Sequence, residues 1–272
     1  MDLTTLAAMP PWDWPTDTKD VLLGALRNEG ADEADRCLAA ELAGDLVVMD
    51  DEILDALLAA VSASDESETL RGKAAISLGP ALEQADLEGF GDPDDLVISE
   101  SAFRRAVQSL RKLYLDTALP ADVRRCILEA SVRAPQDWHA DAIRTAFASD
   151  DPAWKLSAVF STRWVGGFED QILESLTSEN EDIGYEAVHA AGRWTIDAAW
   201  RHVAGLITGG TASKDLLLAA IEAAANIRPD EAGAILVGLT EADDEDIVAA
   251  ADEAMAGLPG DDEFEFDDEE RT

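Results

Sequence analysis

The eight residues Leu70–Ser77, which read LRGKAAIS, contain the pattern that decides the fold. An apolar residue opens the segment, Ala74 follows four positions later, and Ser77 follows seven positions later. Residues at these spacings lie on one face of an α-helix. The segment therefore predicts a helix whose packing face carries small side chains, so that a neighbouring helix can approach closely.

The same pattern recurs along the chain. Later copies begin at Val123, Trp154, Ile183, Leu216 and Ile247, and a weaker copy begins at Ala34. From Leu70 onward the successive starts are 53, 31, 29, 33 and 31 residues apart. Repetition at about this period is typical of stacked helical hairpins.

The segments between these copies predict the second helix of each hairpin. We expect these helices at Asp51–Val61, Ser101–Leu115, Asp137–Ala148, Phe168–Leu176, Thr195–Leu206 and Pro229–Leu239. The long first interval is assigned to an insertion at residues 85–100, interpreted as a loop that leads into a helix at 99–116. Apolar residues recur at helical spacing after residue 15, and no Val/Ile run alternates with period two. The sequence predicts an all-α, right-handed α-solenoid of about six helical hairpins, with capping helices at 17–28 and 243–257.

Thr69–Gly79, together with Asp122–Arg124 and Asp182-Ile183, resembles HEAT-repeat proteins, in particular the short bacterial repeats of the phycobilin-lyase type. The resemblance covers residues 31–258 and implies that the second helices line the concave surface. It says little about activity, because this scaffold hosts many functions.

The two ends differ from the repeats. Residues 1–30 combine a capping helix with the segment Pro10–Pro15, which reads PPWDWP and predicts an extended stretch whose two Trp side chains fold back over the first hairpin; partner binding is the alternative. Residues 259–272 form an acidic tail that we expect to be disordered when unbound. That tail is either simply solvated or a docking motif that uses Phe264 and Phe266.

The charge balance limits the possible partners. The chain has 272 residues and a formal net charge of −38, which repels nucleic acids and anionic membranes and favours basic partners. Its acidity reflects either adaptation to concentrated salt or an ordinary acidic surface. With no signal-like segment and only Cys37 and Cys126, expected to be small core residues, the sequence predicts a cytoplasmic protein.

Basic and aromatic residues gather in the middle of the chain. Ten of the twenty Lys and Arg residues lie between 101 and 163, and five of the seven Trp with all three His lie between 138 and 202. Trp and Arg dominate many protein interfaces. The candidate partner-binding residues are Trp138, His139, Arg144, Trp200, Arg201, His202, Arg104 and Arg111. In the alternative interpretation, the aromatic side chains fill spaces between repeats and the arginines pair with acids on adjacent repeats.

No string typical of a catalytic, nucleotide-binding or metal-binding site occurs, and the paired His-Glu motifs that a di-iron HEAT hydroxylase needs are missing. We therefore predict no catalytic residue, metal or cofactor, although catalysis by acid pairs alone stays open. The favoured function is a monomeric protein-protein interaction scaffold that binds an extended or basic segment of a partner. The alternative is an accessory subunit of an enzyme, or a lyase-like factor that handles a chromophore or modifies a protein.

Overall fold

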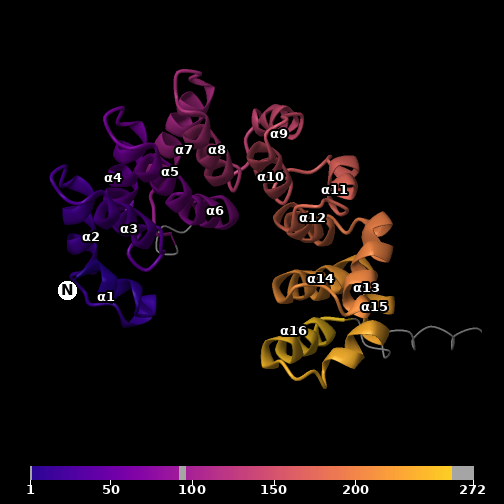
Figure 1. Ribbon diagram of the computed structural model, residues 1–272. Coiled ribbons are helices and arrows are strands. Elements are labelled where there is room, and N and C mark those ends of the chain that lie inside the picture. The colour runs from indigo at the N-terminus through magenta and orange to yellow at the C-terminus, as the bar shows by residue number, and fades with distance from the viewer. Residues whose placement is uncertain (1, 92–95, 259–272) are drawn as a thin grey trace, which may run out of the picture. The chain divides into compact units, whose positions relative to one another are not determined.

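The computed structural model describes residues 2–91 and 96–258, and all regular elements in these ranges are helices. The chain forms two compact units, Met1–Thr145 and Ala146–Thr272, so their boundary falls inside the region predicted as one repeat array. None of the helices in the described ranges has the combined length and apolar character needed to cross a membrane. Each unit is a stack of helical hairpins (Figure 1).

In the first unit, three helices that each open a hairpin pack side by side, α3 against α5 and α5 against α8 (Figure 1). The helices of this unit are α1 (Leu3–Ala7), α2 (Thr18–Arg27), α3 (Glu33–Ala43), α4 (Asp51–Ser62), α5 (Glu68–Ser77), α6 (Gly79–Glu88), α7 (Glu100–Leu115), α8 (Ala121–Ser131) and α9 (His139–Phe147), whose last two residues lie past the boundary. The repeat starts at Leu70 and Val123 fall in the first turns of α5 and α8.

The second unit repeats the arrangement, with α10, α12, α14 and α16 packed in series (Figure 1). Its helices are α10 (Pro152–Ser161), α11 (Glu169–Ser175), α12 (Glu181–Arg193), α13 (Trp200–Gly209), α14 (Lys214–Ile227), α15 (Pro229–Leu236) and α16 (Glu245–Ala256). The helix predicted at 17–28 is α2, and the one predicted at 243–257 is α16. The all-α fold of stacked helical hairpins is thus confirmed.

Small side chains set the spacing of the stacked helices, as the repeat pattern predicts. A Cβ added at Gly44, after α3, would lie 2.9 Å from the Ser77 Cβ at the end of α5. In the second unit, a Cβ added at Gly192 of α12 would lie 2.8 Å from the Ala223 Cα of α14. At such distances the neighbouring helices are almost in contact. Glycine fits at both positions without displacing the adjacent helix, whereas any larger residue would force the two helices apart.

Many of the acidic residues begin helices. The side chains of Asp32, Asp50, Asp151 and Asp244 each accept a hydrogen bond from a backbone N–H in the first turn of the helix that follows. Such N-caps contribute about 1 kcal/mol each, and further acids in the first turns interact favourably with the helix dipole. Part of the negative charge therefore has a structural role.

Three arginines in the first unit join the hairpins through the same contact. Each donates from its guanidinium to a backbone carbonyl ten residues earlier, near the end of the preceding helix. The three contacts are Arg36 to Leu26 (3.0 Å), Arg71 to Val61 (3.0 Å) and Arg124 to Tyr114 (2.8 Å). Because the last carbonyls of a helix lack partners within it, each arginine fixes the turn between two successive helices.

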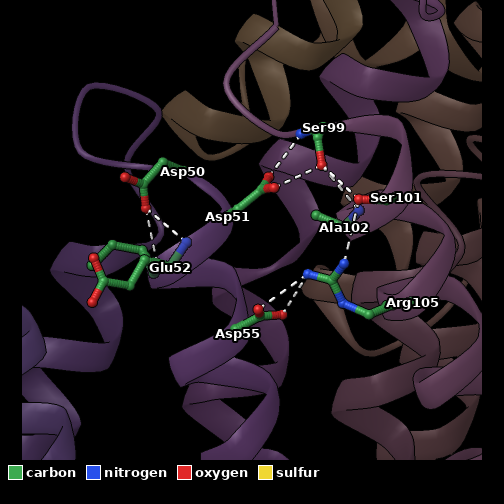
Figure 2. A network of polar contacts seen from close by, with 9 residues as sticks. Asp50, Asp51, Glu52, Asp55, Ser99, Ser101, Ala102 and Arg105 are labelled. Carbon is green, nitrogen blue, oxygen red and sulfur yellow. Dashed lines mark hydrogen bonds and ion pairs between the residues drawn. The ribbon is translucent and has the colours of Figure 1, made fainter.

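Polar contacts also join the second helices of the first two hairpins (Figure 2). The Asp51 carboxylate at the start of α4 accepts from the backbone N–H (2.7 Å) and the hydroxyl (2.6 Å) of Ser99, the residue that caps α7. One turn further along, Asp55 accepts two hydrogen bonds from Arg105 of α7, at 3.0 and 3.1 Å. The two helices are thus held in register along their exposed sides.

The insertion agrees only in part with its prediction. We expected a loop at residues 85–100, but α6 follows α5 directly and extends to Glu88, so residues 85–88 are helical. The described residues 89–91 and 96–99 are non-helical, as expected. Pro80 lies in the first turn of α6, where proline is well tolerated because its missing N–H would have no helical partner. The helix predicted at 99–116 is present as α7. Residues 92–95 of the predicted loop lie outside the described residues.

The N-terminal Pro/Trp segment agrees only in part with its prediction. Trp14 is held against α1, since its indole N–H donates to the carbonyls of Leu6 (3.0 Å) and Met9 (3.2 Å). Trp12 instead remains 79% exposed on a short 3₁₀ turn at Pro11–Asp13, so only one of the two indoles folds back. The predicted tail motif, Phe264 and Phe266, lies outside the described residues.

Candidate functional site

A groove runs along the stacked helices α12, α14 and α16 of the second unit. Its volume is about 690 Å³. The residues that α14 and α16 contribute recur at spacings of three and four, for example Leu218, Glu222 and Ala225 on α14, so each helix presents one continuous face. We call this hollow the second-unit groove.

Most of the uncharged groove surface is apolar and made of small residues. Leu218 and Ile221 of α14 lie beside Ala249, Ala250 and Ala254 of α16. Ile221 is almost completely buried, whereas Ala249 is exposed. Because alanine projects little beyond the helix backbone, a side chain from another molecule can come close to α16 along this line.

Four carboxylates border the groove: Asp215 and Glu222 on α14, and Asp246 and Glu253 on α16. The nearby Lys214 binds Asp244 (2.8 Å) and Asp246 (2.6 Å), and these two hydrogen bonds raise the pKa of the lysine. Within the described part of the chain, Asp215, Glu222 and Glu253 form no ion pair with a Lys or Arg. The groove therefore presents uncompensated negative charge around an apolar centre.

His189 and Tyr185 of α12 form the third wall, with their rings in an edge contact at 4.6 Å between centroids. Burial, together with the charge of Arg163, lowers the pKa of His189 to about 4, so the imidazole is neutral at pH 7. Its Nδ1 lies 3.7 Å from a carboxylate oxygen of Glu222, but a neutral ring does not offset that charge. Burial also raises the pKa of the Tyr185 phenol, which keeps its proton.

The equivalent surface of the first unit has a different charge arrangement. A hollow of about 470 Å³ lies along α3, α5 and α8; we call it the first-unit hollow. Here Lys73 forms an ion pair with Glu41, and Arg125 lies 3.8 Å from Asp122 of the lining and 2.8 Å from Glu129 outside it. The two basic residues are themselves part of the lining, so the negative charge of this hollow is largely compensated.

Trp138 and His139, two of the predicted binding residues, are part of the core of the first unit. His139 is completely buried and Trp138 is 9% exposed. The His139 Nδ1 accepts a hydrogen bond from the Gln136 backbone N–H (2.8 Å), and its Nε2 lies 3.0 Å from the Ser131 hydroxyl. Burial lowers the pKa of His139 to about 4. In the described structure these two side chains pack between α8, α9 and Tyr114 of α7, so their burial favours a role in the core.

The other predicted residues on second helices divide between the two units. Arg144, on α9, is exposed and bonded to Asp141 at 2.8 Å. Trp200, Arg201 and His202 begin α13, with Arg201 exposed and the other two partly so. The Arg228 guanidinium lies over the Trp200 ring, 5.7 Å from the ring centroid. Partner binding by these four residues stays a prediction.

Arg104 and Arg111 both lie on α7 and both pair with acids. Arg104 lies 2.5 Å from Glu100, and Arg111 lies 3.3 Å from Asp137. Further ion pairs of the basic block join separate segments of a unit: Arg105 with Asp55, Arg133 with Glu83, Lys155 with Glu174, and Arg163 with Glu186. These contacts favour the interpretation of the block as arginines paired between repeats.

Sequence reasoning missed the second-unit groove, although the repeat contains a signal for it. Counted from each repeat start, the positions two and six residues later carry Tyr185 and His189 on α12, Leu218 and Glu222 on α14, and Ala249 and Glu253 on α16. The same positions on α5, Gly72 and Ile76, line the first-unit hollow. A comparison of these two positions between repeats would have predicted that three neighbouring helices present acidic or aromatic side chains on the same surface.

The described residues contain no group of three or more His, Cys, Asp or Glu side chains placed to hold a metal ion. Cys37 is buried and Cys126 is partly buried, and burial raises the pKa of both thiols. Neither cysteine therefore has the thiolate character of a reactive residue at neutral pH.

Comparison with known proteins finds similarity in structure alone. No family model matches the chain, and no curated protein matches its sequence. Among solved structures, YibA of Escherichia coli is 15% identical with a TM-score of 0.47, over 91% of this chain and 84% of that one. Human deoxyhypusine hydroxylase, in complex with glycerol, is 15% identical with a TM-score of 0.40, over 93% and 87%. An engineered protein is 19% identical with a TM-score of 0.35, over 89% and 96%. Each of these similarities is structural and at low sequence identity, and no function is inferred from them.

Proposed function

We propose that this chain is a protein-protein interaction scaffold and that its second-unit groove receives a segment of the partner. The observation that carries the proposal is the groove itself, a hollow of about 690 Å³ on one continuous face of three stacked helices. Grooves between packed helices are common sites for partner segments. The helices that line it are fixed by close packing, as at Gly192 and Ala223, so the surface is largely preformed.

Affinity capture from the native lysate tests this proposal when the groove is filled by substitution. Ala249 on α16 is exposed and lines the groove, whereas Ala234 on α15 is exposed in the same unit but does not line it. Ala249→Trp therefore inserts a large side chain into the site, and Ala234→Trp is the matched control. Circular dichroism of both variants establishes that the helices are intact.

The expected result is that partners captured by the unmodified chain are lost with Ala249→Trp and kept with Ala234→Trp. Mass spectrometry of the captured proteins provides the readout. If both variants capture the same proteins as the unmodified chain, the second-unit groove is not the binding surface.

A further inference from the structure

We propose that the second-unit groove selects a short partner segment that presents lysine or arginine side chains on both sides of an apolar residue. This inference rests on the proposed function, because it specifies which segment the groove receives. It follows from the position of charge around the groove, from the shape of the groove centre, and from the contrast with the first-unit hollow.

The positions of the carboxylates define the expected positions of the basic side chains. Glu222 on α14 and Glu253 on α16 occupy equivalent places in their repeats and border the same groove. Neither forms an ion pair with a Lys or Arg in the described ranges, and His189, which lies beside Glu222, is neutral at pH 7. A segment with basic residues on two sides would meet opposite charge on both helices.

The groove centre accounts for the apolar part of the segment. Leu218, Ala250 and Ala254 offer apolar surface at the groove, with little side-chain bulk on α16. One aliphatic side chain placed here removes its surface from water without displacing a buried group. Tyr185 provides an aromatic ring at the wall, on which a lysine or arginine side chain can also pack.

The first-unit hollow shows that this charge arrangement is not a general property of the acidic chain. Its lining contains Lys73 and Arg125, each paired with a carboxylate. The second-unit lining contains four carboxylates and no Lys or Arg among its described residues. Carboxylates of the second-unit groove can therefore attract a basic segment, whereas in the first-unit hollow Lys73 and Arg125 already pair with carboxylates.

Peptide binding to the full chain tests the inference. The probe is a fluorescent, helix-forming peptide of about 14 residues, long enough to follow the groove face of α16, with lysines on either side of a central leucine. A second peptide has glutamate in place of each lysine. The groove variant is Glu222→Gln/Glu253→Gln, and its matched control is Asp230→Asn/Asp252→Asn, which removes two exposed charges of the same unit outside the groove.

We expect fluorescence anisotropy to show binding of the lysine peptide, weakened about tenfold or more by the groove variant and less than about threefold by the control. The glutamate peptide should not bind. Equal weakening by the two double variants, binding of both peptides, or binding of neither would overturn the inference. If the peptide results fail while Ala249→Trp still abolishes partner capture, the groove remains a binding site and only its preference for basic segments is wrong.

Discussion

The two units are built from the same repeat but use their charged residues differently. In the first unit, Arg36, Arg71 and Arg124 each bond to a carbonyl of the preceding helix, and Lys73 and Arg125 neutralise acids in the hollow. In the second unit, the repeat starts at Ile183, Leu216 and Ile247 are followed by Gly, Leu and Val instead of Arg. The lining of the second-unit groove therefore contains carboxylates but no Lys or Arg among its described residues.

This difference teaches that the repeat pattern fixes packing but not surface chemistry. The positions that stack, such as Ala74 in the first unit and Ala187 in the second, are small and buried. In the first unit, an arginine one or two positions after the repeat start joins hairpins, whereas the three groove helices have an uncharged residue at both of these positions. Charged residues of the first unit thus stabilise the fold, whereas Glu222 and Glu253 of the second-unit groove form no ion pair with a Lys or Arg in the described ranges.

The largest expected effect is the loss of an arginine that joins hairpins. Arg36 is 7% exposed and contacts both oxygens of Glu66 at 2.6 Å as well as the Leu26 carbonyl. Arg36→Met leaves a mostly buried carboxylate and a carbonyl without their partner, so we expect it to lower the free energy of unfolding by about 4 kcal/mol.

Hydrogen exchange read by mass spectrometry locates this effect, since faster exchange should be confined to peptides of the first unit. The exposed Arg104→Met is the control, and it should change stability by less than about 0.5 kcal/mol. If Arg36→Met and Arg104→Met lower the free energy of unfolding equally, the distinction between structural and surface arginines is wrong.

His139, which is buried, and His189, which is partly buried, give the next comparison, with one in each unit. His139 has hydrogen-bond partners on both ring nitrogens, whereas the His189 Nε2 is buried and has none among the described residues. His139→Leu should therefore cost about 2 kcal/mol, while His189→Leu should be close to neutral, because it removes an unsatisfied polar group. Urea titration at pH 7 measures both values.

Both histidines also predict that stability depends on pH. Their pKa values are about 4 in the folded chain, below the usual 6.5. Between these values the unfolded chain binds protons that the folded chain does not, so the stability present above pH 6.5 is lost as the pH falls towards 4. For the fully buried His139 the loss is about 3 kcal/mol. Urea titrations at pH 7 and pH 4.5 measure how much the free energy of unfolding falls between these two pH values. This fall should be smaller in His139→Leu than in the unmodified chain by about that amount. An equal fall in the two proteins would contradict the lowered pKa.

The sequence predicted the helices well because the repeat carries its own register. The starts at Leu70, Val123, Trp154 and Ile183 all fall within the first turns of observed helices. The helix α6 escaped prediction, since Gly79-Pro80 resembles a break in the chain, although proline in fact begins the helix.

The binding residues were harder to predict, because exposure depends on packing: Trp138 precedes α9 and turns into the core against Tyr114. The groove joins three helices, each of which alone has only an ordinary polar face.

Glycine substitutions test whether close helix packing is shared by the two units. A Cβ at Gly192 would meet the backbone of α14, whereas a Cβ at Gly205 of α13 meets nothing within 4 Å. Gly192→Ala should cost about 1 to 2 kcal/mol through forced separation of the helices. Gly205→Ala should stabilise by about 0.5 to 1 kcal/mol, because alanine favours the helix. Gly44→Ala should repeat the Gly192 result in the first unit, and thermal unfolding of all three variants measures these differences.

The smallest expected effect concerns Lys214, the lysine beside the second-unit groove. Its ammonium group lies within 2.8 Å of Asp244 and 2.6 Å of Asp246, which lines the groove. Lys214→Met should free Asp246 and strengthen binding of the lysine peptide about twofold, with little change in stability because the pair is exposed. Lys73→Met, which frees Glu41 in the first-unit hollow, is the matched change in the other unit. We infer that only the second-unit groove combines uncompensated charge with a suitable apolar centre. Fluorescence anisotropy should therefore show stronger binding of the lysine peptide to Lys214→Met and unchanged binding to Lys73→Met. Equal gains from both variants would mean that net charge, and not the arrangement of the groove, controls binding.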